Sequence, residues 1–269
     1  MFEPPALSLS LAGLSAQPGG AWSSGPREAI RWAVRVGFAW VQPDAGGRGL
    51  RPRDLDRSAR RDVAALLRRC GLSLSGLDLW IPPEHFNDPA TCDRALAASL
   101  AAIDLLADLA RLAEPGPGSG GQSAGGPVLS LTLPENPSPA VEAALRERGG
   151  EAGVRIADHA WPIQRVHDDD DSITHGVDPA RILLGGSDPA ALVARLGPSL
   201  GSVRLSDADS VARVTPLSAS GRLDGLGYVA ALSGAAYRRP VVLDLRGVAT
   251  DPGLAAPAAH EAWARLAPG

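Results

Sequence analysis

Residues 202–209, SVRLSDAD, and residues 240–247, PVVLDLRG, decide the fold of this 269-residue chain. Each is a short apolar run that ends in charged residues, and the amphipathic segment 224–235 between them has the pattern of a helix. A strand, a helix and a second strand in this order predict two parallel strands. Because side chains alternate along a strand, Asp244 and Arg246 share one face and emerge together where the second strand ends. Charged residues at this end are typical of functional sites in α/β proteins.

The same alternation of strands and helices covers the rest of the chain. The pattern predicts eight strands, over residues 6–11, 38–43, 72–80, 127–133, 153–159, 172–179, 202–207 and 241–246. Helices are expected between most of them, the longest over 90–113. Between the fifth and sixth strands the chain is too short for a full helix, so we expect a reduced one there. The predicted fold is α/β, a (β/α)8 TIM barrel that forms a single domain over residues 1–269.

Composition excludes several classes of protein. The chain is 45% apolar with a formal net charge of −4, and no apolar run is long enough to span a membrane, so we expect a soluble protein without a membrane partner. All 26 basic residues are arginine, which excludes Schiff-base and P-loop lysines. The arginines form no basic stripe, so no nucleic-acid partner is expected. The start of the chain lacks a secretory signal, which favours a cytoplasmic protein, and a homo-oligomer stays open.

Three further features carry no specific site. Cys70 and Cys92 lack CxxC spacing, which leaves no zinc signature and no disulfide framework. The Gly/Ser-rich stretch at about 114–126 is typical of a flexible loop, and its glycines follow a helix, whereas a dinucleotide-binding fingerprint follows a strand. The acidic run Asp168–Asp171 favours a solvated loop, with a loose metal site as the alternative.

Five segments carry a resemblance to a known family: REAIRWAVRVGFAWVQP (27–43), GLSLSGLDLWIPPEHF (71–86), VDPARILLGGSDPAAL (177–192), VRLSDAD (203–209) and the ending from Pro216 to Gly247. In these segments the chain resembles the xylose isomerase-like TIM-barrel superfamily of sugar and sugar-phosphate isomerases and epimerases. The resemblance implies a divalent metal held by acidic residues on the fifth, sixth and eighth strands and by a histidine on the seventh. Such a metal polarises the oxygens of the substrate while carboxylates move a proton between adjacent carbons.

The family's ligand positions fall on a changed set of residues. The acid on the fifth strand corresponds to Asp158, or to Ala157 if the register slips by one residue and turns the side chain to the other face. The acids on the sixth and eighth strands correspond to Asp178 and Asp244. The histidine on the seventh strand is replaced by Arg204, whose protonated guanidinium has no lone pair for a metal. We therefore expect no cofactor, with a Mn, Mg or Zn ion as the alternative.

These positions predict a ligand pocket at the carboxyl ends of the strands. Asp158 and Asp244 are the candidates for acid and base roles. The candidates for ligand binding are Asp178, Arg204, Arg246, His159, Trp80, His85 and Arg213. For the charged residues the alternative is a structural ion network at the barrel mouth. For Trp80 it is a place in the core, and Asp207 and Asp209 are expected to be loop or cap residues.

Two functions are compatible with this pattern. The leading one is an isomerase or epimerase-like barrel that acts on a sugar, a sugar phosphate or a related polyol, with Asp158 and Asp244 in acid and base roles. The other is a catalytically silent protein that binds a small carbohydrate-type molecule, or has a regulatory role, on the same fold. Arg204 at the position of a histidine favours the second, so whether the chain is an enzyme stays open.

Overall fold

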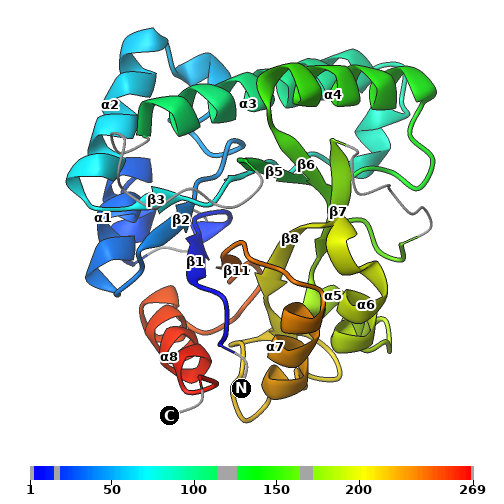
Figure 1. Cartoon of the computed structure of the whole chain (residues 1–269). Coiled ribbons are helices and arrows are strands. Elements are labelled where there is room, and N and C mark those ends of the chain that lie inside the picture. Colours follow the sequence, from blue (N-terminus) through cyan, green and yellow to red (C-terminus); the bar gives the residue numbers. More distant parts are fainter. Residues whose placement is uncertain (1–2, 15–18, 114–125, 164–171, 268–269) are drawn as a thin grey trace.

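The computed structural model describes residues 3–14, 19–113, 126–163 and 172–267, which form one parallel sheet wrapped by helices (Figure 1). The strands of the sheet are β1 (Leu7–Ser10), β2 (Trp40–Gln42), β3 (Ser73–Leu74), β4 (Leu77–Asp78), β5 (Val128–Leu131), β6 (Arg155–Asp158), β7 (Ile173–Val177), β8 (Leu200–Leu205) and β11 (Val241–Leu243). Their order across the sheet is β3-β2-β1-β11-β8-β7-β6-β5-β4. Two further strands, β9 (Asp207–Ala208) and β10 (Arg213–Val214), pair antiparallel beyond the end of β8.

The two edge strands of this order are consecutive in the chain. β3 pairs with β2, and β4 pairs with β5, and only Ser75 and Gly76 lie between them. A side chain at Gly76 would not fit, because its Cβ would lie 2.2 Å from the carbonyl oxygen of Val128. The segment 73–78 therefore closes the sheet into a barrel, and the single strand predicted over 72–80 is present as β3 and β4. This confirms the predicted α/β barrel with eight strands in chain order.

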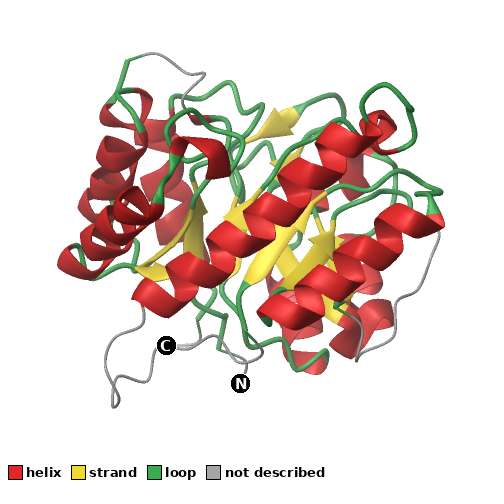
Figure 2. Cartoon of the chain, turned by 90° about the horizontal axis from the view of Figure 1, so that it is seen from above, coloured by secondary structure: helices red, strands yellow, loops and turns green. Residues whose placement is uncertain are grey.

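Helices surround the strands on the outside of the barrel (Figure 2). They are α1 (Pro26–Arg35), α2 (Arg57–Arg69), α3 (Cys92–Ala113), α4 (Pro139–Ala152), α5 (Pro179–Leu184), α6 (Pro189–Leu196), α7 (Gly225–Gly234) and α8 (Pro252–Ala264), with short 3-10 turns η2 (Ala21–Ser23), η3 (Pro52–Asp54), η4 (Pro83–Phe86) and η5 (Gly197–Ser199). Five of the α-helices begin after a side chain that accepts a backbone N–H, namely Asp56, Ser138, Asp188, Asp224 and Asp251. Helix α5 was not predicted, because its six residues are too few for a clear period.

Between β6 and β7 the described residues, 159–163 and 172, form no helix, in line with the reduced connection expected there. The acidic run Asp168–Asp171 and residues 114–125 of the predicted loop lie outside the described residues. No helix in the described part of the chain combines the length and the apolar character needed to span a bilayer.

The apolar core lies between the sheet and the helices. Alternate strand residues such as Leu9, Ile156 and Leu243 are fully buried there against helix residues such as Leu105 and Val193. Burial of this apolar surface is the main force that holds the barrel together. The side chains on the opposite face of each strand point toward the barrel axis, and this inner face carries the candidate site.

Candidate functional site

The inside of the barrel is lined by small polar side chains. Hydrogen bonds run between strands that are not neighbours in the sheet, from Gln42 Nε2 to Ser130 Oγ (3.3 Å) and between Ser130 Oγ and Ser202 Oγ (3.3 Å). Ser8 and Ser75 join in the same way, with 2.7 Å between their hydroxyl oxygens. Such bonds must cross the interior, so these side chains point inward. TIM barrels more commonly fill this space with branched apolar residues. In this protein the small polar side chains lie below a second layer of inward-pointing residues, which is charged and lies at the carboxyl ends of the strands.

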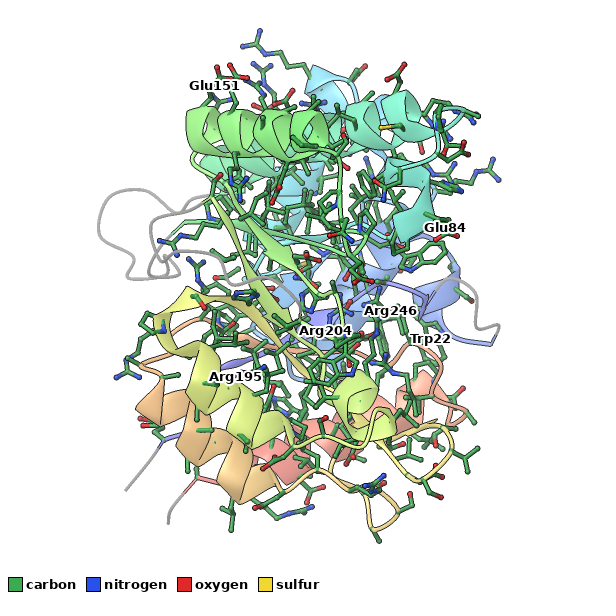
Figure 3. The ribbon with its side chains drawn as sticks, turned by 90° about the vertical axis from the view of Figure 1, so that its right-hand side faces the viewer. Trp22, Glu84, Glu151, Arg195, Arg204 and Arg246 are labelled. Carbon is green, nitrogen blue, oxygen red and sulfur yellow. The ribbon has the colours of Figure 1, made fainter. Side chains whose placement is uncertain are left out.

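Arg204 occupies the centre of that charged layer (Figure 3). Its Nη2 lies 2.7 Å from Asp78 Oδ2, and its Nη1 lies 3.1 Å from Asp244 Oδ2 and 3.5 Å from Asp178 Oδ2. The three carboxylates come from β4, β11 and β7 or from the residue that follows them. One guanidinium therefore links three strands across the mouth of the barrel.

Two more arginines complete what we call the charge cluster, formed by Asp78, Asp178, Arg204, Arg213, Asp244 and Arg246. Arg246 donates two hydrogen bonds to Asp244, from Nε to Oδ1 at 3.0 Å and from Nη2 to Oδ2 at 2.8 Å. Its Nη1 donates to Asp78 Oδ1 at 3.0 Å. Arg213 places Nη1 3.2 Å from Asp178 Oδ2 and Nη2 3.3 Å from Asp244 Oδ2. Three positive groups thus balance three negative ones.

The three arginines fix the protonation states of Asp178 and Asp244 inside the charge cluster. Burial alone would raise the pKa of Asp244, but Arg246, Arg213 and Arg204 outweigh it and hold that pKa well below its usual value. The pKa of Asp178 is likewise lowered by Arg213 and Arg204 against the effect of burial, and Ser206 Oγ donates to its Oδ1 at 2.6 Å. Both groups are carboxylates at neutral pH. A buried carboxylate of low pKa is a poor proton acceptor.

The structure brings together five of the charged residues that the sequence analysis named as site candidates, and it adds one that the sequence analysis did not name. Asp178, Arg204, Arg213, Asp244 and Arg246 all meet in the charge cluster. The sequence reasoning missed Asp78, although the parity rule that exposed Asp244 also applies to an acid between two leucines, Leu77 and Leu79. The sequence gives no indication of which strands lie across the barrel from Asp78, and its partners Arg204 and Arg246 come from those strands or the turns after them.

Asp158 lies outside the charge cluster. Ser130, which points inward, is in register with Ala157, and Ala157 is in register with Thr174, so the inward residue of β6 is Ala157. The Oδ1 of Asp158 instead accepts the backbone N–H groups of Leu133 (2.9 Å) and Ala160 (3.0 Å). The preferred register of the sequence analysis is thus corrected to its alternative, because one residue of slip moves a side chain to the other face.

His159 points inward together with Ala157. Its ring is 1% exposed and packs on Gly176, where an added Cβ would lie 2.4 Å from His159 Cδ2. Neither ring nitrogen has a hydrogen-bond partner among the described residues. Burial, with Arg204 and Arg246 adding to it, lowers the pKa of His159 well below its usual value, so the imidazole is neutral. Two unpartnered buried nitrogens are uncommon and indicate a polar group or a water molecule at this place.

The aromatic candidates lie after β4. Trp80 is 64% exposed, which rules out the alternative of a core position for its side chain. His85 belongs to η4 and is half-buried, and its carbonyl oxygen accepts from Thr91 Oγ1 at 3.1 Å. Neither side chain forms a hydrogen bond or an ion pair with the charge cluster within the described residues.

Asp209 is a loop residue, as expected, whereas Asp207 is the first residue of β9, and both accept backbone N–H groups of the connection that follows β8. Asp207 is 1% exposed, and its two oxygens accept backbone N–H groups of Ala208, Leu217, Arg222 and Leu223. Asp209 Oδ1 accepts from the backbone of Val211 and Ala212. The first of these anchors holds the long connection after β8, which carries Arg213 into the charge cluster.

Comparison with solved structures agrees with this architecture. A xylose isomerase domain protein from Planctomyces limnophilus superimposes with a TM-score of 0.67 at 16% identity, over 99% of this chain and 98% of its own. The fold is that of the xylose isomerase-like TIM barrels. A D-allulose 3-epimerase from Methylomonas sp. in complex with D-allulose (TM-score 0.61, 17% identity, 98% and 95% covered) and a sugar phosphate isomerase/epimerase from Parabacteroides distasonis (0.64, 12%, 98% and 96%) share it. No family model matches the chain, and no curated protein matches it either.

The residues at the mouth do not suit the divalent metal that a xylose isomerase-like barrel implies. Within the described ranges, no three His, Cys, Asp or Glu side chains are placed to hold a metal ion. The three carboxylates that converge each face guanidinium groups at 2.7–3.5 Å, and a cation would have to displace them. Ala157, the inward residue of β6, has no donor atom.

Proposed function

We propose that this xylose isomerase-like barrel binds a small carbohydrate-type molecule at its mouth without a resident metal, and that it is catalytically silent. The observation that carries the proposal is the position of Arg204 among Asp78, Asp178 and Asp244. A fixed guanidinium supplies the positive charge that would otherwise come from a cation. It leaves no open coordination position at which substrate oxygens could be polarised.

The alternative, a sugar isomerase or epimerase, finds little support in the geometry. Such an enzyme needs a base with a pKa near neutral within reach of the substrate carbon. Asp244 is completely buried and its Oδ2 accepts from three arginines. Asp158 is turned to the other face of β6 and bound to backbone N–H groups. Neither of the two candidates for proton transfer is arranged for it.

Several features support a small polar ligand at this end of the barrel. Ligands of TIM barrels bind at the carboxyl ends of the strands. Polar atoms that lack a hydrogen-bond partner among the described residues are present there, namely both ring nitrogens of His159, one a donor and one an acceptor in the neutral ring, and the donor Nε of Arg213. Trp80, exposed at the end of β4, offers an aromatic face of the kind that stacks on sugars. The D-allulose complex of a structural neighbour sets the expected chemical class.

The test combines metal analysis with a search for turnover. We expect elemental analysis of purified protein to find no stoichiometric Mn, Mg or Zn, and melting to be unchanged by Mn²⁺ or chelator. A ligand at ~100 times its dissociation constant adds about 2.7 kcal/mol to the free energy of unfolding, so a bound metal would be evident. Ketose and aldose sugars incubated with the protein in D2O should show no exchange of carbon-bound hydrogen by NMR. Stoichiometric metal, or exchange above the protein-free control, would return the chain to the metal-dependent isomerases.

A further inference from the structure

Helices α1 and α2, with the segment that joins them, carry a concentration of positive charge. Residues 27–69 contain 11 arginines and 5 acidic residues, a formal charge of +6, whereas the rest of the chain contains 15 arginines and 25 acidic residues, a formal charge of −10. The two helices lie on the same flank of the barrel (Figure 1). None of these 11 arginines belongs to the charge cluster. The positive charge of this acidic protein is therefore concentrated in one part of its surface.

The fold arranges six of these arginines in two rows, which we call the arginine face. In a helix with about 3.6 residues per turn, positions four, seven, eight or eleven residues apart lie within about a quarter turn of one another. The exposed side chains at such positions are Arg27, Arg31 and Arg35 on α1 and Arg57, Arg61 and Arg68 on α2. The rows are adjacent, since Arg27 Nη2 lies 3.6 Å from Asp62 Oδ2 on the other helix. The expectation that the arginines form no basic stripe is thus corrected, because packing of two helices creates a stripe that is interrupted in the sequence.

Much of the charge on the arginine face is not neutralised within the protein. Arg35, Arg57 and Arg61 form no ion pair with a carboxylate in the described part of the chain. Arg27 and Arg31 do pair with acids, but on both sides of these pairs the side chains are 41–63% exposed, and such surface pairs contribute little energy. At ~0.1 M salt the Debye length is about 10 Å, so acidic residues on other sides of the barrel cancel little of this local charge. The face therefore offers guanidinium groups to an anionic partner.

The length of the rows and the chemistry of arginine suit a chain of phosphates. Guanidinium groups bind phosphate oxygens in a bidentate geometry. At about 1.5 Å per residue, the row on α1 is about 12 Å long and the row on α2 about 16 Å. A nucleic-acid duplex carries about one charge per 1.7 Å of its axis. Each row therefore spans several phosphates.

The side chains around the arginines disfavour other anionic partners. Tight docking of an acidic protein, or stable attachment to an anionic membrane, needs an apolar or aromatic anchor in addition to charge. Of the large apolar side chains of α1 and α2 only Val34 is exposed, at 39%. The one aromatic residue of the two helices, Trp32, is buried, which leaves no platform on which the bases of a single strand could stack. Binding to the backbone of a duplex requires neither kind of anchor.

We propose that the arginine face binds the phosphate backbone of double-stranded nucleic acid without sequence preference. Contacts from arginine to phosphate release counterions from the duplex, so the binding is strong at low salt and weakens steeply as the salt concentration rises. Such contacts carry no information about the bases. The inference goes beyond the proposed function and is independent of it, because the arginine face lies on the outer helices and shares no residue with the site at the barrel mouth.

The experiment titrates a fluorescent DNA duplex of about 20 base pairs with the protein and follows its anisotropy at several salt concentrations. The test variant replaces the three arginines without an ion pair, Arg35→Gln/Arg57→Gln/Arg61→Gln. The control removes the same charge from exposed arginines elsewhere, Arg195→Gln/Arg238→Gln/Arg265→Gln. The test variant should reduce the slope of log K against log salt by about 3, about one for each arginine, and weaken binding at ~50 mM salt at least about tenfold. The control should change the slope by less than about 1.

Three results would overturn the proposal. The first is that the wild-type protein does not bind the duplex at ~50 mM salt, where phosphate contacts are strong. The second is an equal loss of affinity in both triple variants, which would assign the binding to net charge and not to this face. The third is tighter binding, at the same salt concentration, to phosphatidylserine vesicles or to a polyglutamate peptide, which would assign the face to a membrane or to an acidic protein. Far-UV circular dichroism of each variant shows that it is folded before binding is compared.

Discussion

The two faces of the barrel strands differ in almost every physical respect. On the outer face, Leu9, Ile156 and Leu243 are fully buried against the helices. On the inner face of the same strands, Ser10, Ala157 and Asp244 are equally inaccessible but are polar, small or charged. The same degree of burial thus serves apolar packing on one face and a polar network on the other. Exposure alone does not tell core from site in this protein, whereas the chemistry of alternate residues does.

This difference separates two sources of stability. The outer face gains free energy from each apolar group removed from water, about 25 cal/mol per Å². The inner face depends on pairing, since a buried charge is tolerated only with its partner and a buried hydroxyl only with its hydrogen bond. Substitutions on the inner face should therefore act through the partners left behind, and those on the outer face through the cavity they create.

The largest effect is expected on the inner face, from Arg204→Met. Loss of the guanidinium leaves Asp78, Asp178 and Asp244 with two arginines in place of three, and removing one partner of a buried pair costs about 3–5 kcal/mol. Urea unfolding at pH 7 measures this, with Arg195→Met on the exposed surface of α6 as the control that should change little. A cost below about 1 kcal/mol would mean that the cluster behaves like a surface ion pair.

Acid should reduce this cost. The pKa values of Asp178 and Asp244 are lowered in the folded protein, so the stability they contribute is present above their unfolded pKa of about 3.9 and is lost as the pH falls through the folded values. In Arg204→Met these carboxylates take up protons at a higher pH, so the difference in unfolding free energy between this variant and the wild type should shrink toward pH 4.

Arg204→His should lose stability in the same way, but adding Mn²⁺ should restore part of its unfolding free energy, since imidazole can ligate a metal where arginine cannot.

The second effect compares the faces directly at neighbouring positions. Ile156→Ala on the outer face removes a fully buried side chain and should cost about 2–5 kcal/mol. Ser130→Ala on the inner face removes a hydroxyl that bonds Gln42 and Ser202, at a cost of about 1 kcal/mol. Both are measured by urea unfolding under one condition. Equal costs would show that the interior is packed as tightly as the outer core.

How much of this could be predicted depended on whether a signal was local. Strand parity in VVLDLR correctly predicted that Asp244 and Arg246 lie together, although β11 ends at Leu243 and Arg246 belongs to the turn after it, and the alternation of strands and helices correctly predicted the barrel. Asp78 was missed because its partners, Arg204 and Arg246, lie 126 and 168 residues away in the chain. The split of β3 from β4 at Gly76 could not be predicted either, because it depends on the carbonyl of Val128 on another strand.

The register of β6 shows a different limit. In the sequence IADH, both Ala157 and Asp158 are compatible with an inward position, and the resemblance to metal-binding relatives favoured the acid. The structure decides by pairing Ala157 with Ser130, whose direction is fixed by a bond across the barrel. Only contacts between distant strands could have settled this choice.

The third effect concerns His159 and appears as a dependence of the unfolding free energy on pH. Its folded pKa is lowered by burial and by Arg204, Arg246 and Arg181, against the opposing effect of Asp244. Below the unfolded pKa of about 6.5, the unfolded chain binds a proton that the folded protein does not, so stability falls with falling pH by up to about 1.4 kcal/mol per unit. His159→Phe should remove this contribution. The measurement is the difference in unfolding free energy between the two proteins from pH 8 to pH 5, in which the other histidines cancel, and a flat difference would contradict a buried neutral imidazole.

The smallest effect on stability is expected at Trp80, and it sharpens the comparison by leaving both buried faces intact. Its side chain is 64% exposed at the end of β4, so Trp80→Ala should change the free energy of unfolding by no more than about 0.5 kcal/mol. If Trp80 stacks on a ligand at the mouth, the affinity for a bound sugar should fall several-fold while the melting temperature stays the same. Leu254→Ala, a change at a similarly exposed residue of α8, should alter neither quantity. A loss of stability without a loss of affinity would assign Trp80 to packing, because only a contact made with the ligand can separate the two measurements.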